Sequence, residues 1–352
     1  MNSHSSLSLS SPYSFFPPVV LPFPLSLFLF PFGLLFFLSH TLYHTPHSVR
    51  IVPEFDLPAH MASWAQGYPS LITDCPTYNP HPEWPRYYSP ADVTNEQLYK
   101  VLDVVLTELK DIFVDQHWHV GGDEPHYQCW DLNEKIVNYK MKQGNWTNNQ
   151  LYSYFSHRYG AIVRNHNKSR IGWDEMYTIG GKMPPTPGHD DDDSIVHVWT
   201  DNTKLAEVVH AGLRGIISEN WYLNNGGDWT KYYNDDPMSY LSKNATSVEK
   251  NRVLGGEACM WMSAFDSSSN MSPTIWPNAA AVAERLWSGK ENVQTVDKAR
   301  TRLSQQRCRM IRRGVAASPI AEDYCDDSLY VRKSRSFVYP GDFPVDPETP
   351  GP

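Results

Sequence analysis

Two adjacent carboxylates, Asp123 and Glu124, follow a short apolar run that ends in two glycines, His117-Trp-His-Val-Gly-Gly-Asp-Glu-Pro125. In an ordinary strand neighbouring side chains point to opposite faces, but two glycines and a proline let the chain bend and bring both carboxylates into one pocket. Carboxylates this close split their pKa values, so that one stays ionised and the other holds a proton as a general acid. A solvent-facing acidic turn seldom follows a buried strand of this kind. We therefore predict an acid–base site at this strand end.

Other carboxylates and indoles lie at the predicted ends of further strands. Short apolar or β-branched runs alternate with helical patterns, which is typical of βα units around a parallel sheet. The predicted strands are residues 49–56, 117–124, 170–175, 195–200, 213–219 and 252–261. In β/α barrels the functional groups lie at the carboxyl ends of the strands. These ends supply Glu54, Asp56, Asp123, Glu124, Trp173, Asp174, Glu175, Trp199, Trp221, Tyr222, Glu257 and Trp261. Such a rim fits a glycosidase pocket better than a phosphate or metal site.

Amphipathic segments between these strands predict the outer helices of a barrel. Thr94 and Gln97 form a capping-box pattern, and apolar residues recur at helical spacing from Leu98 to Ile112. Further helices are predicted at residues 149–165, 202–210 with Asp201 as N-cap, 277–287 and 293–313. An open doubly wound sheet would show the same alternation, but the chain has no GxGxxG or P-loop motif. The pattern favours a barrel, with the acidic tract at residues 184–193 as a solvated loop.

Composition narrows the class of partner. With 352 residues, 41% of them hydrophobic, the chain can bury the core of one large domain or two ordinary ones. A net charge of −9 argues against nucleic acid, whose binding depends on basic residues meeting phosphates. The chain has 12 Trp and 20 Tyr; most are expected in the core, but sugar-binding clefts also use aromatic faces.

Cysteines and glycosylation sequons indicate an oxidising compartment. The five cysteines contain no CxxC pair, which argues against a zinc site. Four Asn-x-Ser/Thr sequons begin at Asn145, Asn167, Asn244 and Asn270. Each matters only if the chain passes through a lumen. We expect a lysosomal or secreted protein, with no metal and no cofactor.

The first segment of the chain has an unusual composition. Residues 1–49 contain no Lys, Arg, Asp or Glu, and residues 19–38 are apolar enough for a signal or membrane-anchoring segment. However, no basic residue precedes this run, and its prolines at positions 22, 24 and 31 would interrupt a spanning helix. A secretory or membrane segment and a non-native leader both remain open. We expect residues 1–47 to be a leader, 48–325 a catalytic barrel and 326–352 a tail.

The run His-Val-Gly-Gly-Asp-Glu resembles the hallmark of the β-N-acetylhexosaminidases of glycoside hydrolase family 20. Other segments resemble further family motifs in the same order: Val52-Pro-Glu-Phe-Asp-Leu-Pro-Ala-His60, Ile171-Gly-Trp-Asp-Glu175, Val198-Trp199, Trp221-Tyr-Leu223, Leu254-Gly-Gly-Glu-Ala-Cys-Met-Trp261, Trp276-Pro277 and Ala283-Glu-Arg-Leu-Trp-Ser288. The resemblance implies a (β/α)8 TIM barrel of which strands three to eight are recognisable. It implies hydrolysis of terminal N-acetylhexosamine residues from glycans, with glycans as partners and a homodimer left open.

The resemblance also implies a retaining mechanism in which the substrate's own acetamido oxygen attacks C1. Glu124 would be the general acid and base, and Asp123 would hold the acetamido N–H. Tyr222 would donate a hydrogen bond to the acetamido carbonyl. The substrate-binding residues would be Trp173, Trp199 and Trp261 around the sugar, Asn224 near its outer hydroxyls, and Asp56 and His60 beside Glu124. A plain core role for Asp56 and His60 stays open.

Two disulfides follow from the same resemblance, Cys75–Cys129 and Cys308–Cys325, with Cys259 as a free thiol. The sequence departs from the family at several positions. Asn224 and Ser263 stand where acidic residues usually contact the sugar, Asn278 replaces a usual Arg, and no segment before Ser48 resembles the first two barrel strands. The alternative to an active hydrolase is a catalytically impaired or vestigial glycan-binding homologue that lacks these strands.

Overall fold

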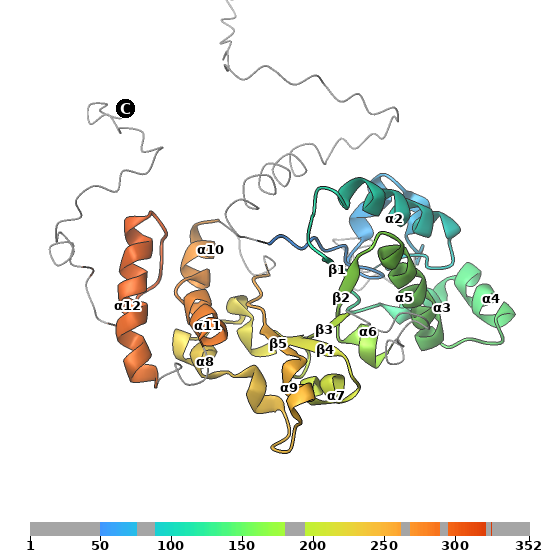
Figure 1. Ribbon diagram of the computed structural model, residues 1–352. Helices are drawn as coiled ribbons and strands as arrows, with labels where there is room; N and C mark the ends of the chain where they lie inside the picture. The colour runs from blue at the N-terminus through green and yellow to red at the C-terminus, as the bar shows by residue number, and fades with distance from the viewer. Residues whose placement is uncertain are drawn as a thin grey trace, which may run out of the picture.

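A five-stranded parallel sheet forms the centre of the described part of the chain (Figure 1). The computed structural model describes residues 50–75, 89–179, 194–261, 268–288, 295–321 and 325. The strands are β1 (His117–His119), β2 (Ser169–Trp173), β3 (Ile195–Val198), β4 (Arg214–Ile217) and β5 (Val253–Gly256). Their spatial order equals their order in the sequence, and all neighbours are parallel. This is the strand order of a β/α barrel, and the fold class is α/β as predicted.

Helices connect successive strands and pack around the sheet. The α-helices are α2 (Glu96–Leu109), α3 (Tyr127–Leu132), α4 (Glu134–Lys142), α5 (Asn148–Asn165), α6 (Glu175–Thr178), α7 (Lys204–His210), α8 (Trp229–Asn234), α9 (Ser247–Asn251), α10 (Ser268–Ile275), α11 (Asn278–Trp287) and α12 (Val296–Arg312). Short 3-10 turns are η2 (Ala62–Gln66), η3 (Pro69–Leu71), η4 (Glu219–Trp221), η5 (Leu223–Asn225) and η6 (Pro237–Tyr240). In Figure 1, α2 to α5 lie at one side of the sheet, and α10 to α12 lie at the other.

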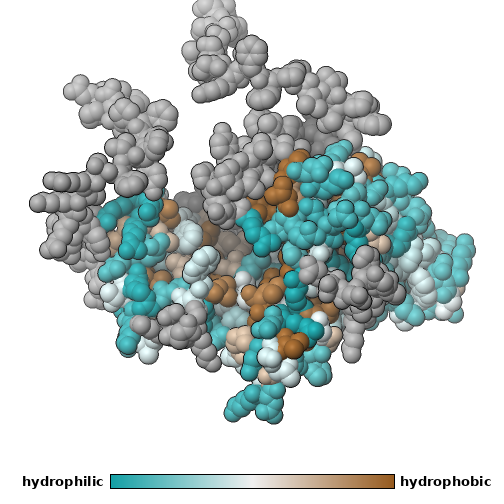
Figure 2. Space-filling model, viewed as in Figure 1, coloured by the Kyte–Doolittle hydropathy of each residue, from teal (hydrophilic) through white to brown (hydrophobic). Residues whose placement is uncertain are grey.

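The helix predicted after Thr94 shows how the pattern produces the packing. Its apolar spacing buries Leu98, Leu102 and Leu106 completely, as a helix with one core-facing stripe requires. The predicted N-cap was one residue early, because Asn95, not Thr94, accepts the hydrogen bond from the Gln97 amide. In Figure 2 the polar outer faces of this helical side appear largely teal, whereas brown apolar residues gather toward the sheet.

One prediction of local structure was wrong. Residues 50–56 do not form a strand: Glu54 makes a single bridge to His119, because Pro53 has no N–H to extend the ladder. The helix predicted at 202–210 begins two residues later, at Lys204, with Thr203 rather than Asp201 as N-cap, and Asp201 accepts hydrogen bonds from the Thr203 amide and hydroxyl. The other predicted helices agree with the structure to within about three residues, the usual uncertainty at helix ends.

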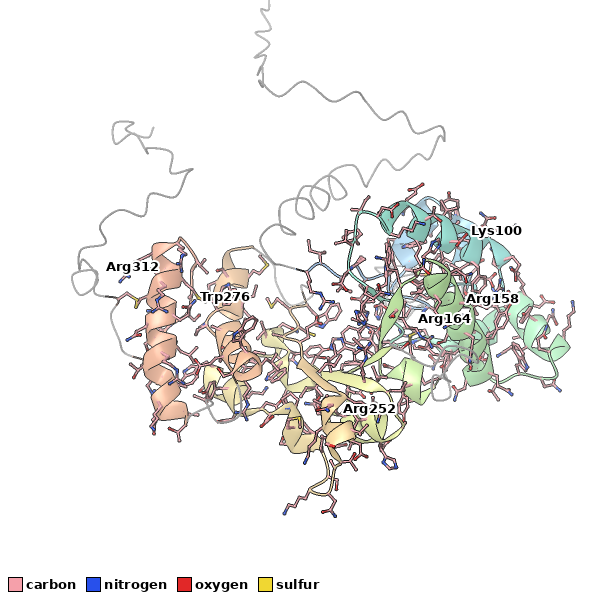
Figure 3. The ribbon with its side chains drawn as sticks, viewed as in Figure 1. Lys100, Arg158, Arg164, Arg252, Trp276 and Arg312 are labelled. Carbon is pink, nitrogen blue, oxygen red and sulfur yellow. A yellow bond between two sulfur atoms is a disulfide. The ribbon has the colours of Figure 1, made fainter. Side chains whose placement is uncertain are left out.

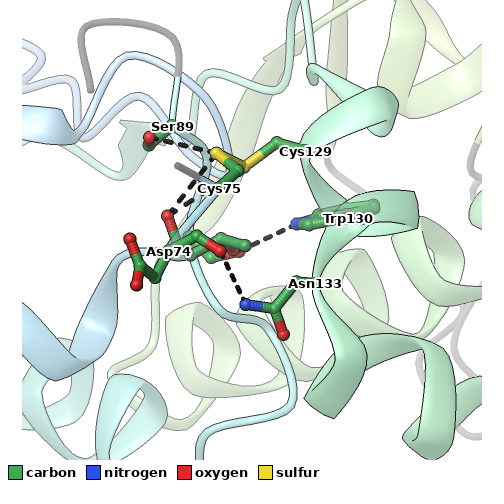
Figure 4. The surroundings of a disulfide bond; sticks show 8 residues. Asp74, Cys75, Ser89, Cys129, Trp130 and Asn133 are labelled. Atoms are coloured by element: carbon green, nitrogen blue, oxygen red, sulfur yellow. Dashed lines mark hydrogen bonds between the residues drawn. A yellow bond between two sulfur atoms is a disulfide. The ribbon is translucent and has the colours of Figure 1, made fainter. Parts of the chain in front are cut away.

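The two expected disulfides are present and Cys259 is free and buried. Cys75–Cys129 ties the segment after η3 to α3, where Cys75 contacts Ser89 and Asn133 donates to the carbonyl oxygen of Asp74 (Figure 4). It therefore links the chain that carries His60 to the helix that follows Glu124.

The described helices include none that is both long and apolar enough to cross a bilayer. The leader at 1–47, with its apolar run at 19–38, the acidic tract at 184–193, Ser263 and the tail at 326–352 all lie outside the described residues. The predictions about them therefore stay predictions.

Candidate active site

The chain bends sharply after β1, and its glycines allow the bend. The backbone angle φ is +66° at Gly121, +117° at Gly122 and +45° at Glu124, in the region that side chains other than glycine rarely adopt. A Cβ atom on Gly121 would lie 1.9 Å from Oδ1 of Asp56. The Gly122 amide donates to the same oxygen at 3.1 Å. The bend thus brings the segment after β1 against Asp56, as the two glycines predicted.

Asp123 and Glu124 lie at one pocket and share a histidine. Asp123 is 8% exposed, whereas the Glu124 side chain is 51% exposed. Nε2 of His60 lies 3.4 Å from Oδ2 of Asp123 and 3.5 Å from Oε2 of Glu124. The other oxygen of Asp123, Oδ1, is buried and has no hydrogen-bond partner among the described residues. An unsatisfied buried acceptor is costly, and the N–H of a ligand could satisfy it.

Burial and crowding shift the proton affinities around this pair. Burial, followed by the neighbouring Asp123 carboxylate, raises the pKa of Asp56 to about 9. Hydrogen bonding to Asp123 and Glu124 raises the pKa of His60 to about 11, against the opposing effect of burial. At neutral pH Asp56 therefore holds a proton and His60 is cationic. His60 places a positive charge between two carboxylates, which is the kind of environment found at acid–base sites.

Asp56, His60 and Asp123 are also the only group in the described chain with metal-ligating geometry. One ligand atom from each lies within 4.8 Å of the others. A metal would need Asp56 ionised, whereas its raised pKa favours the protonated acid.

Four aromatic rings form an enclosure next to Asp123, one from the end of each of four successive strands. They are Trp173 after β2, Trp199 after β3, Tyr222 after β4 and Trp261 after β5. Ring centroids are 6.3 Å apart for Trp173–Trp199 and for Trp199–Tyr222, 6.5 Å for Tyr222–Trp261 and 6.1 Å for Trp261–Trp173. The four distances close a ring of side chains. Such an enclosure fits a small apolar group of a ligand.

Carboxylates behind the enclosure hold two of its indoles. Nε1 of Trp173 donates to Glu54 at 3.0 Å, and Nε1 of Trp199 donates to Glu175 at 2.9 Å. Burial raises the pKa of Glu175 to about 7. Burial also raises the pKa of Tyr222 well above its usual range, so its hydroxyl remains a donor at neutral pH. The enclosure thus has fixed walls and one polar donor.

The side chain of Asn224 contacts the backbone of Trp261, one of the four residues of the enclosure. Its Oδ1 accepts a hydrogen bond from the Trp261 amide at 3.3 Å, and its Nδ2 donates to Asn225. Trp261 itself is 38% exposed and lies at the rim. Asn224 therefore helps to position the backbone that carries the Trp261 indole.

The structure brings together every predicted site residue that it describes, but two rim residues of the sequence pattern lie elsewhere. Trp221 is fully buried and donates to the carbonyl of Tyr232, so it belongs to the core. Asp174 is also fully buried, bonded to Thr200 and Lys204. Both were placed at the rim because they lie at the ends of predicted strands, and position in the sequence alone does not distinguish a rim residue from a core residue.

Sequence reasoning did not identify the role of two further residues. Tyr152 of α5 donates a hydrogen bond to the Gly122 carbonyl and fixes the bend before Asp123. Glu175 holds Trp199. Glu175 was predicted at the rim, but its hydrogen bond to Trp199 was not, and nothing in the sequence relates Tyr152 to a loop 30 residues away.

Comparisons with known proteins agree with this geometry. The family model "Glycosyl hydrolase family 20, catalytic domain" matches residues 41–290. The chain is 36% identical to β-hexosaminidase subunit beta of Homo sapiens, over 79% of this chain and 49% of that protein. It is 34% identical to subunit alpha of Mus musculus, over 80% of this chain and 52% of the relative. The chain thus spans about half the length of the curated relatives it matches.

Solved structures show the same fold. The chitobiase of Flavobacterium johnsoniae superimposes with a TM-score of 0.67 at 29% identity, covering 79% of this chain and 42% of that one. The exo-β-N-acetylglucosaminidase of Vibrio harveyi, solved in complex with N-acetylglucosamine, gives a TM-score of 0.66 at 18% identity, covering 81% and 46%.

Proposed function

Because this chain belongs to glycosyl hydrolase family 20, we propose that it hydrolyses terminal, non-reducing N-acetylhexosamine residues from glycans by substrate-assisted, retaining catalysis. The observation that carries the proposal is the aromatic enclosure of Trp173, Trp199, Tyr222 and Trp261 beside the buried, unpartnered Oδ1 of Asp123. This combination suits a 2-acetamido group, which has an apolar methyl, an N–H donor and a carbonyl acceptor.

In the first step the acetamido carbonyl oxygen attacks C1 as the bond from C1 to the leaving oxygen breaks. Glu124 is the general acid that protonates the leaving oxygen, since it is the more exposed carboxyl and faces the rim. Asp123 accepts the acetamido N–H and stabilises the positive charge that develops on this group. Tyr222 donates its hydroxyl hydrogen to the acetamido carbonyl and orients it for attack.

In the second step water attacks C1 and the carbonyl oxygen leaves, which restores the acetamido group. Glu124, now ionised, removes the proton from water. Two inversions at C1 give overall retention of configuration. His60 is a positioning residue: its cationic ring lies within 3.4 Å of Asp123 and 3.5 Å of Glu124 and holds the two carboxyl groups in place.

The enclosure provides the selectivity. Trp173, Trp199 and Trp261 surround the acetamido methyl and one face of the sugar, where a polar or charged group would be desolvated without a partner. Plain glucosides lack the acetamido oxygen and should react by this route at no measurable rate.

Paired aryl glycosides test the proposal directly. We expect turnover of the aryl N-acetylglucosaminide and none of the aryl glucoside. Tyr222→Phe, which keeps the ring but removes the donor, should reduce kcat by about 10²-fold or more, the scale of losing one preorganised donor. Comparable rates on the two glycosides would exclude substrate-assisted attack. Binding of N-acetylglucosamine without turnover of any glycoside would support the impaired glycan-binding alternative instead.

We also propose that residues 48–325 form the catalytic unit and that the chain acts in a lysosomal or extracellular compartment. Two disulfides within the described residues support an oxidising environment. A homodimer is a further proposal, which the oligomeric state in solution would test. N-terminal sequencing of the secreted product would determine whether residues 1–47 are removed.

A further inference from the structure

A second cluster of aromatic and polar side chains lies on the helical side of the protein, away from the strand ends. It forms a groove of about 410 Å³ that we call the α5 groove, lined by Trp146, Gln150, Ser153, Tyr154, His157 and Arg158. The groove is shallow and largely open to solvent, so a ligand in it would keep one face exposed. Figure 3 shows Arg158 on this side of the molecule, near Lys100. None of these residues contributes to the catalytic pocket.

The walls of the groove are flat rings held in place by other rings. Trp146 packs against Tyr154 at 5.6 Å and against Tyr139 at 6.3 Å between ring centroids. Tyr154 also contacts Tyr99 of α2. Trp146 and Tyr154 are half-buried, so part of each remains open to a ligand. A rigid, partly exposed indole is a suitable surface for the apolar face of a sugar ring.

The charges of the groove favour a neutral ligand. Arg158 makes two hydrogen bonds to the Glu96 carboxylate, at 2.5 Å and 2.6 Å, and its guanidinium lies 3.6 Å above the Tyr99 ring. Since this cation already has its anion, an acidic ligand would gain little. Gln150 and His157 are exposed and supply neutral hydrogen-bonding groups at the edge. Aromatic faces with neutral polar edges match the chemistry of a pyranose.

A glycosylation sequon adjoins the groove. Asn145 precedes Trp146 directly, about 3.8 Å away between Cα atoms, and Thr147 completes the motif. Asn145 is exposed in the turn between α4 and α5, where Gly144 has φ +89° and Asn145 φ +61°. No hydrogen bond of its side chain is recorded in the described residues. An N-linked sugar on Asn145 would therefore be attached one residue from Trp146, which lines the groove.

We propose that Asn145 carries an N-linked glycan and that the α5 groove holds its innermost N-acetylglucosamine, with one sugar face against Trp146. In the transfer, Nδ2 of Asn145 forms a bond to C1 of a lipid-diphosphate-linked oligosaccharide. The bond from C1 to the phosphate oxygen breaks, the lipid diphosphate leaves with the electron pair, and the amide proton goes to solvent. The groove then immobilises the first sugar without any further covalent step.

Two other sequons serve as internal references. Asn167, in the turn between α5 and β2, and Asn244, in the turn before α9, are both exposed. Neither adjoins a residue that lines the α5 groove. A glycan on either should be freely accessible, whereas one on Asn145 should be partly shielded.

The first experiment measures occupancy. The full chain is secreted from a eukaryotic cell line, and its glycopeptides are analysed by mass spectrometry after enzymatic removal of glycans in ¹⁸O-water. We expect an ¹⁸O label at Asn145 that Asn145→Gln abolishes. An unlabelled Asn145 in material labelled at Asn167 or Asn244 would overturn the proposal.

The second experiment measures shielding, as the rate at which an endoglycosidase releases the glycan from Asn145 in the folded protein. Trp146→Ala should accelerate release about fivefold, the factor that corresponds to ~1 kcal/mol of ring contact, and Trp146→Phe should largely retain protection. Release from the reference sequons should not change. Met141→Ala is the matched control, because Met141 is 52% exposed on the neighbouring α4 and does not line the groove.

A third variant keeps the test valid if Trp146→Ala fails to fold. His157 is exposed, and within the described part of the chain its hydrogen bonds join it to Ser153 on its own helix, so His157→Ala should fold. It should also accelerate release, by a smaller factor. If release from Asn145 is equally fast in the unchanged protein, His157→Ala and Met141→Ala, the groove does not hold the sugar and the proposal is wrong.

Discussion

The pocket at the strand ends and the α5 groove both contain several aromatic rings, but their charged side chains are arranged differently. In the pocket, Asp123 and Glu124 share one histidine, and burial, followed by the Asp123 carboxylate, raises the pKa of Asp56 to about 9. In the groove, Arg158 pairs with Glu96 and lowers the pKa of that carboxyl. Burial and neighbouring carboxylates therefore favour a proton on Asp56 in one region, whereas a cation favours the ionised form of Glu96 in the other.

The difference indicates what each kind of residue contributes. Aromatic faces recognise a sugar in either environment, because stacking needs only a flat apolar surface. Bond cleavage needs carboxyl groups that can give and take a proton beside the bond that breaks. On the two proposals, the regions separate recognition from chemistry within one chain, and substitutions in each should have separate effects.

The largest expected effect is on turnover. Glu124→Gln keeps the shape of the side chain but removes the transferable proton, and should lower kcat on an aryl N-acetylglucosaminide by at least about 10²-fold. Glu108→Gln is the matched control, since Glu108 is an exposed carboxylate on α2 outside both regions. Near-normal turnover by Glu124→Gln would exclude Glu124 as the general acid and remove the contrast between the regions.

The next effect is on stability. Replacing Cys75 and Cys129 by serine should lower the free energy of unfolding by about 2–4 kcal/mol. Cys308–Cys325 closes 17 residues rather than 54, so its loss should cost about 1 kcal/mol less in the chain-entropy model. Urea unfolding of both double variants measures this difference.

The same bridge distinguishes the two regions. The bridge links the segment that carries His60 to α3, beside the pocket. The α5 groove is lined instead by residues of α5 and of the turn before it. In the variant without Cys75–Cys129, activity should disappear at lower urea than the amide protection of α5. Simultaneous loss of both would mean that the two regions unfold as one unit.

The bend of the chain at the pocket could be predicted from the sequence, whereas the residues that support it could not. The glycines before Asp123 indicated a bend, and the structure places φ above +60° at both. The residues that hold the pocket in place were not predictable, because Tyr152 reaches Gly122 from a helix that is distant in sequence. Long-range hydrogen bonds leave no local pattern, whereas turns do.

Two other predictions failed because a local pattern in the sequence does not determine the backbone conformation. Trp221 follows the predicted strand 213–219, which placed it at the rim, but it lies in the 3-10 turn η4 and is fully buried in the core. Residues 49–56 have β-type composition, yet Pro53 restricts pairing to a single bridge. Composition identifies the segment, whereas backbone hydrogen bonding determines whether a strand forms.

A moderate effect should appear at the rim. Asn224→Asp keeps the oxygen that accepts from the Trp261 amide and adds a charge that can accept from an outer sugar hydroxyl. A hydrogen bond to a charged group is worth about 1.5–3 kcal/mol, so kcat/KM on an aryl N-acetylglucosaminide should rise by about tenfold. The exposed neighbour Asn225→Asp adds the same charge and should give no gain. Equal gains from both would indicate a long-range charge effect rather than a contact.

The smallest expected effect concerns Glu175 and the pH dependence of stability. Burial raises its pKa from 4.5 to about 7, so between these values the folded protein holds a proton that the unfolded chain has lost. Stability contributed by this group is therefore fully present below about 4.5 and is lost as the pH rises toward about 7. Glu175→Gln keeps an oxygen to accept from Trp199 but cannot ionise, so the free energy of unfolding of this variant should fall less steeply across that pH interval.

Glu96→Gln is the matched control for the outer region: because Arg158 lowers the pKa of Glu96, this variant should lose stability that the unchanged protein holds at neutral pH. An unchanged slope in Glu175→Gln would mean that Glu175 is already ionised in the folded state, and the contrast in charge between the two regions would then rest on Asp56 and His60 alone.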